Sequence, residues 1–515
     1  MPFSSFGNRS AYPKQILTLL WRSTIFVLGL NRDPSCRKAK SPDLVCTIAW
    51  DTTLIMSDSA LRQRKSKRIM QKQTEVKADW ISALPDSVLC HILSYLPTKN
   101  AVATSLLARR WKLVWTSLQK LYFDDRQSRR LPGMMGDPMP GFEEFVETVL
   151  TGTYPTNITT FFVHCSRPVD LSSFHLWVCS AVRRNAREIE LYLDQNHRVE
   201  LPEELYTSVS VEVLKLMSDF VIKVPAGGTS FPNVKILSVQ LESPENSLTE
   251  KLFCSCPALE ELSIQAYLND EGPTTKFVIS SSTLKRCTLW VATEGEMFTQ
   301  AEYKVRITAP SLERLHIMSD IFGKFVVHDL NSLTDVILDI VYGEWSRVDP
   351  NRAIQLLQRL NNTKNLTVSY GVLCALDHAY HIWFPALSHL QHLEVAVGAI
   401  GWAVLPVILS SSQNLQSLIL RKQSRFEVTE EQFGWIEGDI VPNCLLQHVK
   451  KIEIKGVEGD DDELILVDYL LKYSSVLEVM VICFKGSVSK QERRDIGRSI
   501  LQVQRASNRC KLELV

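Results

Sequence analysis

The chain has 515 residues, of which 45% are hydrophobic and 22% charged, an ordinary globular composition whose length indicates several domains or one long repeat array. Lys plus Arg and Asp plus Glu both number 57, and this zero net charge argues against bulk electrostatic binding of nucleic acid or an anionic membrane. The 12 cysteines form no CxxC pair and no regular spacing, which favours reduced thiols and a location in the nucleus, the cytoplasm or both.

The first part of the chain, 1–77, is predicted to be a mostly disordered leader. Its apolar stretch 16–30 is interrupted by Arg22 and is shorter than the ~20 residues of a membrane-spanning helix. An organellar transit peptide is one alternative, and translation from Met56 is the alternative that we favour. The basic run at 62–68 fits a nuclear import signal, a phosphate-contacting arm or a solvated linker.

The next segment, 84–115, predicts three short helices. Pro85 suits a helix start, Pro97 ends the first helix, and Thr98 or Asn100 can cap the second. The first helix carries an apolar stripe, and so small a unit cannot bury all of its own apolar side chains. The remaining apolar face is predicted either to bind a partner protein or to pack on the following domain, and the residues alone leave both open.

This segment resembles the F-box of plant F-box proteins over about 79–123. The similarity lies in Leu-Pro-Asp at 84–86, Ile-Leu-Ser at 92–94, Leu-Pro at 96–97, Thr-Ser at 104–105 and Arg-Arg-Trp at 109–111. The resemblance implies binding to the Skp-type adaptor of an SCF ubiquitin ligase. The adaptor contacts that it implies are Leu84, Pro85, Leu89, Ile92, Leu93, Val102, Leu107 and Trp111.

From about 155 to 425 the chain is periodic. Apolar residues recur at positions i, i+3 and i+5, as in Leu259/Leu262/Ile264 and Leu312/Leu315/Ile317, mostly at the spacing typical of leucine-rich repeats. The i+3 and i+5 side chains of a short strand point to the same side, so stacked units bury them in a continuous core. The segments between the strands are predicted to be helix-like returns.

The residues between these apolar positions are predicted to lie on the opposite, open face of the sheet. Trp290, Met318 and Ile337 would form an apolar spot there, which is typical of a binding surface. The alternative is that long C-terminal loops cover them. The candidate target contacts are Arg286, Trp290, Arg314, His316, Met318 and Ile337.

The resemblance extends to the rest of the chain. Stretches such as 177–193, 252–264 and 309–317 resemble the repeats of plant F-box/LRR proteins, and 441–482 is similar to their FBD domain. The predicted fold is therefore α/β: a three-helix F-box, a strand-plus-helix repeat solenoid, and an FBD at 435–515 that caps it. The implied function is substrate recognition in an SCF ligase, with a Skp-type adaptor, a cullin and an unknown target protein as partners, and no membrane or nucleic acid.

No motif predicts catalysis, a cofactor or a metal. The acidic run at 458–463 lacks the spacing of a calcium loop and fits a solvated turn before a helix. The histidines at 378, 381, 389 and 392, near Cys374, lie on different predicted elements and do not converge as zinc requires. Two other functions stay open: a scaffold outside any ligase, whose F-box face packs internally, and an enzyme with an unrecognised site.

Overall fold

The computed structural model describes residues 81–126, 141–153, 157–194, 198–222, 230–242, 252–253, 256–269, 274–294, 302–320, 323–340, 350–377, 384–398, 404–422 and 441–515. The predicted leader at 1–77, with its basic run at 62–68, lies outside the described residues. From Asp79 onward the chain forms one compact unit.

The first described elements are four short helical segments. Pro85 and Pro97 each stand just before a helix, where a missing N–H costs no hydrogen bond. The predicted cap at Thr98 or Asn100 is wrong, because both residues are already helical. The Thr98 hydroxyl instead accepts a hydrogen bond of 2.7 Å from the backbone N–H of Tyr122. The segments are α3 (Asp86–Leu93), α4 (Thr98–Ala103) and the 3-10 helices η3 (Thr104–Leu106) and η4 (Arg109–Ser117).

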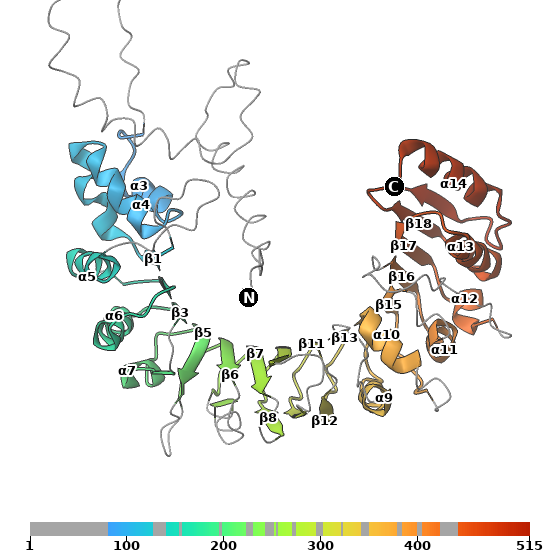
Figure 1. Ribbon diagram of the computed structural model, residues 1–515, viewed down its shortest axis with the longest axis horizontal. Coiled ribbons are helices and arrows are strands. Elements are labelled where there is room, and N and C mark those ends of the chain that lie inside the picture. Colours follow the sequence, from blue (N-terminus) through green and yellow to red (C-terminus); the bar gives the residue numbers. More distant parts are fainter. Residues whose placement is uncertain are drawn as a thin grey trace, which may run out of the picture. The chain divides into compact units, whose positions relative to one another are not determined.

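The main element of the rest of the described chain is a long parallel sheet (Figure 1). Each strand pairs with the strand of the next repeat, so strand order in the sheet follows the chain. The strands are β1 (Lys120–Asp124), β2 (Thr160–Cys165), β3 (Glu188–Leu193), β5 (Val213–Val221), β6 (Ile236–Glu242), β7 (Glu261–Asn269), β9 (Arg286–Glu294), β11 (Arg314–Ser319), β13 (Asp335–Ile340), β14 (Asn365–Val368), β15 (His392–Val397), β16 (Ser417–Lys422), β17 (Lys451–Val457), β18 (Val479–Phe484) and β19 (Lys511–Leu514), with the short β4 (Val199–Glu200) beside β5.

The predicted apolar positions form the core of this sheet. Leu259, Leu262 and Ile264 are fully buried, and the corresponding residues of the other predicted repeats are buried as well. The same i, i+3, i+5 pattern also precedes and follows the predicted repeats, where the sequence analysis did not identify it. The additional buried sets are Leu118/Leu121/Phe123 around β1 and Leu477/Met480/Ile482 around β18.

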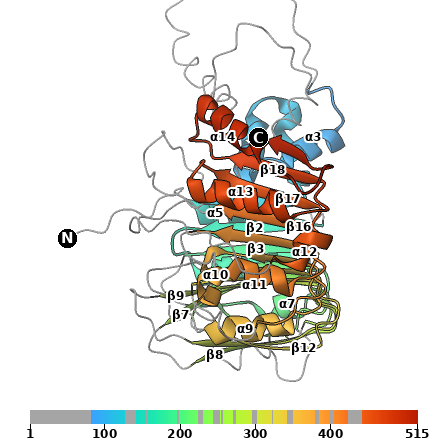
Figure 2. The same cartoon turned by 90° about the vertical axis from the view of Figure 1, so that its right-hand side faces the viewer.

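Helices cover one face of the sheet, as the position of α9, α11 and α13 in front of the strands shows (Figure 2). In α6 the buried residues Phe174, Trp177, Val178 and Ala181 follow helical spacing, and Asp170 caps the helix by accepting from the backbone N–H of Ser173 at 2.9 Å. The helices are α5 (Phe142–Gly152), α6 (Leu171–Arg183), α7 (Glu203–Tyr206), α9 (Pro350–Arg359), α10 (Tyr370–Asp377), α11 (Val404–Ser411), α12 (Asn443–Gln447), α13 (Asp461–Tyr473) and α14 (Lys490–Gln502).

Three central repeats depart from the predicted helix-like returns. Their return segments contain strands, which form a second, three-stranded parallel sheet. In β10 the buried residues Tyr303, Val305 and Ile307 alternate with more exposed ones, which is the two-residue period of a strand. The prediction failed there because it extended one return type to every repeat. The three strands are β8 (Thr275–Ser280), β10 (Tyr303–Thr308) and β12 (Lys324–His328).

The predicted FBD continues the main sheet. Ile452 of β17 lies in register with Leu418 of β16, and β18 and β19 follow in the same parallel arrangement. The helices α13 and α14 lie between these strands in the chain, and a capping box begins each of them. The repeats and the FBD consequently share one hydrophobic core.

Candidate protein-binding surfaces

The F-box segment has a small core of its own residues. Leu89 and Leu93 of α3 are fully buried, and Trp111 and Val114 of η4 are each 6% exposed. The indole N–H of Trp111 donates to the hydroxyl of Ser82 at 2.8 Å, which satisfies its polar atom. This core holds α3 against η4.

The outer side of the same segment exposes many large apolar side chains. Leu106 is 87% exposed and Leu107 is 62% exposed, although both are leucines in a short helical region. Single exposed leucines are ordinary on a protein surface, but several within 33 residues are typical of an interaction surface. We call the following residues the F-box apolar surface: Ile81, Val88, Tyr95, Leu96, Leu106, Leu107 and Leu113.

The eight predicted adaptor contacts fall into three groups. Pro85 and Leu107 are exposed, while Leu84, Ile92 and Val102 are half-buried. The other three, Leu89, Leu93 and Trp111, face the core of the segment, where a partner has no direct access to them. Sequence similarity alone does not separate these groups, because one helix carries both the inward and the outward apolar residues.

The six predicted target contacts all lie on the open face of the main sheet. Arg286 is in register with Arg314, Trp290 with Met318, and His316 with Ile337, so the six occupy neighbouring positions on β9, β11 and β13. Ile337 is 39% exposed, Arg314 is exposed, and the other four are half-buried. The described residues therefore leave the predicted apolar spot accessible to solvent.

Contacts among the open-face side chains order this surface. The ring of Trp290 packs edge-on against Tyr267, with 5.2 Å between ring centroids. The Arg286 guanidinium pairs with Glu261 at 2.7 Å. Burial lowers the pKa of His316, and the Asp339 carboxylate partly opposes this shift. The spot is thus mixed in character, with aromatic, cationic and polar groups side by side.

The sequence analysis missed an aromatic row at the other end of the open face. Tyr122 of β1 stacks on Phe162 of β2 with 4.0 Å between ring centroids, and His164 stacks on Tyr192 of β3 at 3.9 Å. The signal was present in the sequence, because these residues alternate with buried positions of the same strands. Each ring covers a face of its neighbour, so the row stabilises the first strands across the sheet.

One acidic cluster beside this row has the donor types of a cation site. Ligand atoms of Asp124, Asp125 and His164 lie within 4.8 Å of one another. Both carboxylate oxygens of Asp124 accept from Arg126 at 3.0 Å, and both of Asp125 accept from Ser166 at 2.8 Å. Burial lowers the pKa of His164, and the positive charge of Arg126 adds to the effect. Asp124 thus forms an ion pair with Arg126, and Asp125 accepts two hydrogen bonds from Ser166 after the end of β2, so these carboxylates already have partners within the protein.

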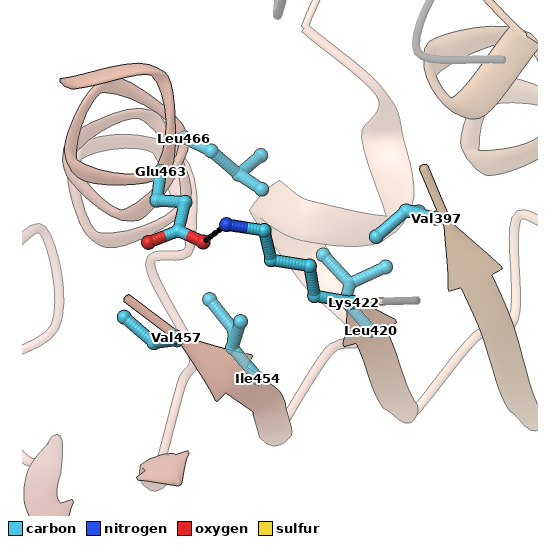
Figure 3. A pocket seen from close by; sticks show the side chains of 7 residues that line it. All are labelled: Val397, Leu420, Lys422, Ile454, Val457, Glu463 and Leu466. Carbon is cyan, nitrogen blue, oxygen red and sulfur yellow. Dashed lines mark hydrogen bonds and ion pairs between the residues drawn. The ribbon is translucent and has the colours of Figure 1, made fainter. Parts of the chain in front are cut away.

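The junction of β16 with the FBD contains a small pocket (Figure 3). Lys422 reaches across it to Glu463, and the remaining lining is apolar: Val397, Leu420, Ile454, Val457 and Leu466. Its volume of about 20 Å³ has room for one water molecule and for no organic ligand. The pocket is therefore a small gap where side chains of β16, β17 and α13 pack together, and it is not a ligand site.

The acidic run at 458–463 is less solvated than predicted. Lys422 Nζ lies 2.9 Å from Glu458, 2.8 Å from Asp460 and 2.6 Å from Glu463. Burial lowers the pKa of Lys422, but the hydrogen bonds to Asp460, Glu463 and Glu458 outweigh burial and raise it. The run begins just before helix α13 and ends in its first turn, near the helix N-terminus as predicted, and its acids hold Lys422 of β16 to this helix start.

The histidine-rich region is only partly described. His378 and His381 lie outside the described residues. His389 Nδ1 lies 3.2 Å from the carbonyl oxygen of Asn361, and Cys374 is buried in α10. His389 and Cys374 thus take part in local structure.

Comparison with known protein families agrees with the three parts of the fold. The F-box domain model matches residues 81–123, and the FBD model matches 437–482. Between them, the model for the LRR repeats of the FBD-associated F-box protein At5g56370 matches 174–330.

Curated relatives match this chain over nearly their full length. An FBD-associated F-box protein of Arabidopsis thaliana, At3g50710, is 30% identical over 85% of this chain and 100% of its own. The chain belongs to the plant F-box/FBD/LRR-repeat family. Two further relatives from the same organism are the F-box/FBD/LRR-repeat protein At1g13780, 28% identical over 84% of this chain and 97% of its own, and F-box/LRR-repeat protein 13, 27% identical over 87% and 98%.

Family membership confirms the predicted fold class. F-box and LRR domains indicate a protein-interaction or substrate-adaptor role, and members of the F-box/LRR family are generally non-catalytic adaptors. F-box domains generally bind Skp-type adaptors. Among the described residues, no helix combines the length and apolar character that crossing a membrane requires.

Proposed function

We propose that this chain is a substrate-recognition subunit of an SCF-type ubiquitin ligase. Its F-box binds a Skp-type adaptor and, through it, a cullin, while the repeats bind a target protein. The chain acts by tethering: holding the target beside the ligase raises its effective concentration, and other subunits carry out ubiquitin transfer. We place this activity in the nucleus, the cytoplasm or both.

One observation carries the proposal most directly. The F-box segment keeps its own core, built on Leu89, Leu93 and Trp111, and still exposes Leu106, Leu107 and Leu113 by more than half. An internally packed F-box, as the scaffold hypothesis requires, would bury these leucines against the repeats. A partner that covers them gains roughly 25 cal/mol for each Å² of apolar surface removed from water.

The residues of the F-box then have two roles. Pro85, Leu107 and the half-buried Leu84, Ile92 and Val102 contact the adaptor directly. The buried residues of α3 and η4 support that surface from behind, so their loss would weaken adaptor binding by unfolding the segment.

The adaptor-binding surface is tested by co-purification with a Skp-type adaptor. In the variant Leu107→Asp, a charge replaces an apolar side chain that is 62% exposed, and co-purification is expected to fall at least about tenfold, since desolvating an unpaired carboxylate is costly. The matched control is Leu176→Asp, which changes a leucine of α6 that is 65% exposed and lies outside the F-box. The control variant is expected to bind normally.

The double variant Leu84→Ala with Pro85→Ala extends the test to the start of the F-box. Adaptor binding is expected to be lost while the far-UV circular dichroism spectrum is retained. Undiminished binding in both the double variant and Leu107→Asp would contradict the ligase assignment and favour the scaffold hypothesis.

The target is proposed to bind the open face around Trp290, where Arg286, Arg314 and His316 surround the exposed Ile337 and the half-buried Met318. Affinity purification with proteasome activity blocked, followed by mass spectrometry, identifies candidates. Trp290→Ala removes a half-buried indole from this face and is expected to reduce capture of a genuine target without reducing adaptor binding. Unchanged capture would move the target site elsewhere.

A further inference from the structure

The two outer strands of the main sheet differ in how their outer edges are covered. At β1, the backbone N–H of Tyr122 donates to Thr98 at 2.7 Å and α4 packs beside the strand. At β19, the strand pairs with β18 alone among the described residues. An uncovered strand edge presents backbone donors and acceptors to any further strand. The β19 edge is therefore a candidate docking surface.

The hydrogen bonds of β19 show which backbone groups face that edge. The N–H groups of Lys511 and Val515 donate to the carbonyls of Glu478 and Ile482, each at 2.9 Å. Backbone groups of successive strand residues point to opposite edges. The N–H and C=O groups of Leu512 and the next even-numbered residue consequently point away from β18.

The side chains of β19 alternate between charged and apolar. Lys511 and Glu513 are exposed on the open face, in register with Val479 and Val481 of β18. The even-numbered leucines lie on the core side; Leu514 packs over Gly497 of α14 and is still 38% exposed. The edge thus carries one positive and one negative charge, two residues apart.

We infer that β19 pairs with β19 of a second copy of this chain, antiparallel, with Leu512 opposite its own counterpart. The outward backbone groups of the two Leu512 residues then form two hydrogen bonds. The two-fold symmetry of such a pair places Lys511 of each copy opposite Glu513 of the other. Opposite charges facing each other across antiparallel strands are stabilising, and this arrangement forms two such pairs.

The other antiparallel registers lack this complementarity. Centring the pair on Glu513 places two carboxylates opposite each other, which is destabilising, and directs the central backbone groups toward β18. Centring it on Leu514 sets Glu513 opposite Val515 and forms no charge pair. The charge pattern of β19 is therefore complementary to that of a second copy, and the register centred on Leu512 is the one that pairs the opposite charges.

Sedimentation velocity of the full-length chain across micromolar concentrations tests this dimer, independently of adaptor binding. The wild-type chain is expected to dimerise. Lys511→Glu alone or Glu513→Lys alone is expected to weaken the dimer at least about tenfold, because two attractive pairs become two repulsive ones. The double variant with both changes restores the opposite charges and is expected to dimerise nearly as the wild type does.

Lys490→Glu, a charge reversal on the exposed first residue of α14, is the control and should leave the dimer intact. Thermal unfolding of each variant checks that the fold is retained. A wild-type chain that stays monomeric throughout the range overturns the inference. A double variant that dimerises as weakly as the single variants also overturns the inference, because restoring the opposite charges should restore the dimer. Rescue, in turn, would show that the single variants had not simply lost their structure, because a second charge reversal would not repair a general loss of structure.

Discussion

Replacing Lys422 by methionine is the sharpest test of how the repeats and the FBD are joined. The substitution keeps an unbranched side chain of similar length and removes the charge. The Lys422 and Glu463 side chains are each 9% exposed, so the variant leaves a carboxylate buried without its cation.

The magnitude follows from the contacts that remain. Removing one partner of a buried ion pair typically costs 3–5 kcal/mol. Glu463 Oε2 keeps three backbone N–H donors, from Glu458 at 3.0 Å, Gly459 at 2.7 Å and Asp460 at 3.2 Å. These donors continue to stabilise the carboxylate, so we expect the lower end of the range, about 3 kcal/mol.

The loss should be local, because stacked repeats interact mainly with their neighbours. Hydrogen exchange with mass spectrometry is expected to show faster exchange in β17 and α13 and little change in β2 and β3. The urea midpoint of the whole chain is expected to fall as well.

The matched control is Lys450→Met. Lys450 lies 3.6 Å from Glu478, and both side chains are 60% exposed, so removing this pair should cost no more than about 1 kcal/mol. Equal effects of the two variants would refute the view that burial makes the Lys422 contacts important. A second check is Glu463→Gln in the Lys422→Met background, which removes the uncompensated charge and should recover part of the loss.

Three further predictions follow from other contacts. Hydrogen bonds from Lys485 and Lys422 hold the pKa of Glu458 below its ordinary value of 4.5. The stability that the ionised Glu458 contributes is therefore present above pH 4.5 and is lost as the pH falls through the lower pKa of the folded state. The difference in urea midpoint between the wild type and Lys422→Met should accordingly be constant from neutral pH down to about 5 and become smaller below 4.5. Trp111→Ala should destabilise the F-box segment by about 3–5 kcal/mol, read as faster exchange in α3 and reduced adaptor binding; unchanged exchange would contradict a core role. Asp125→Ala should cost about 1–3 kcal/mol, since the buried carboxylate accepts from the backbone N–H and the hydroxyl of Ser166, and a thermal midpoint equal to that of the wild type would argue against this role.

The repeats were predictable because each strand carries the apolar i, i+3, i+5 pattern in its own short stretch of sequence. The buried positions at i, i+3 and i+5 depend on the local strand period, which any stretch of sequence shows by itself. The returns between strands were less predictable. The alternation Tyr303, Val305, Ile307 was visible, but whether it forms a second sheet depends on whether β8 and β12 lie beside it.

The F-box surface shows the same division between local pattern and packing. The apolar stripe of α3 and the tryptophan of η4 predicted a compact helical unit. Which apolar residues face inward depended on where α3 meets η4: Leu89 and Leu93 are buried there, whereas Val88 is 40% exposed. Helical spacing restricts the choice to a broad face, and only the neighbouring element selects within it.

By itself the sequence determined the helical F-box, the recurring strands and the order of the three modules, because these depend on periodicity and on residue types close together in the chain. The tertiary structure decided that the FBD continues the sheet, that Lys422 is held by acids 36 to 41 residues away in the sequence, and that β1 is covered at its outer edge. Such contacts join residues far apart in the chain, and their formation depends on the packing of every element between them.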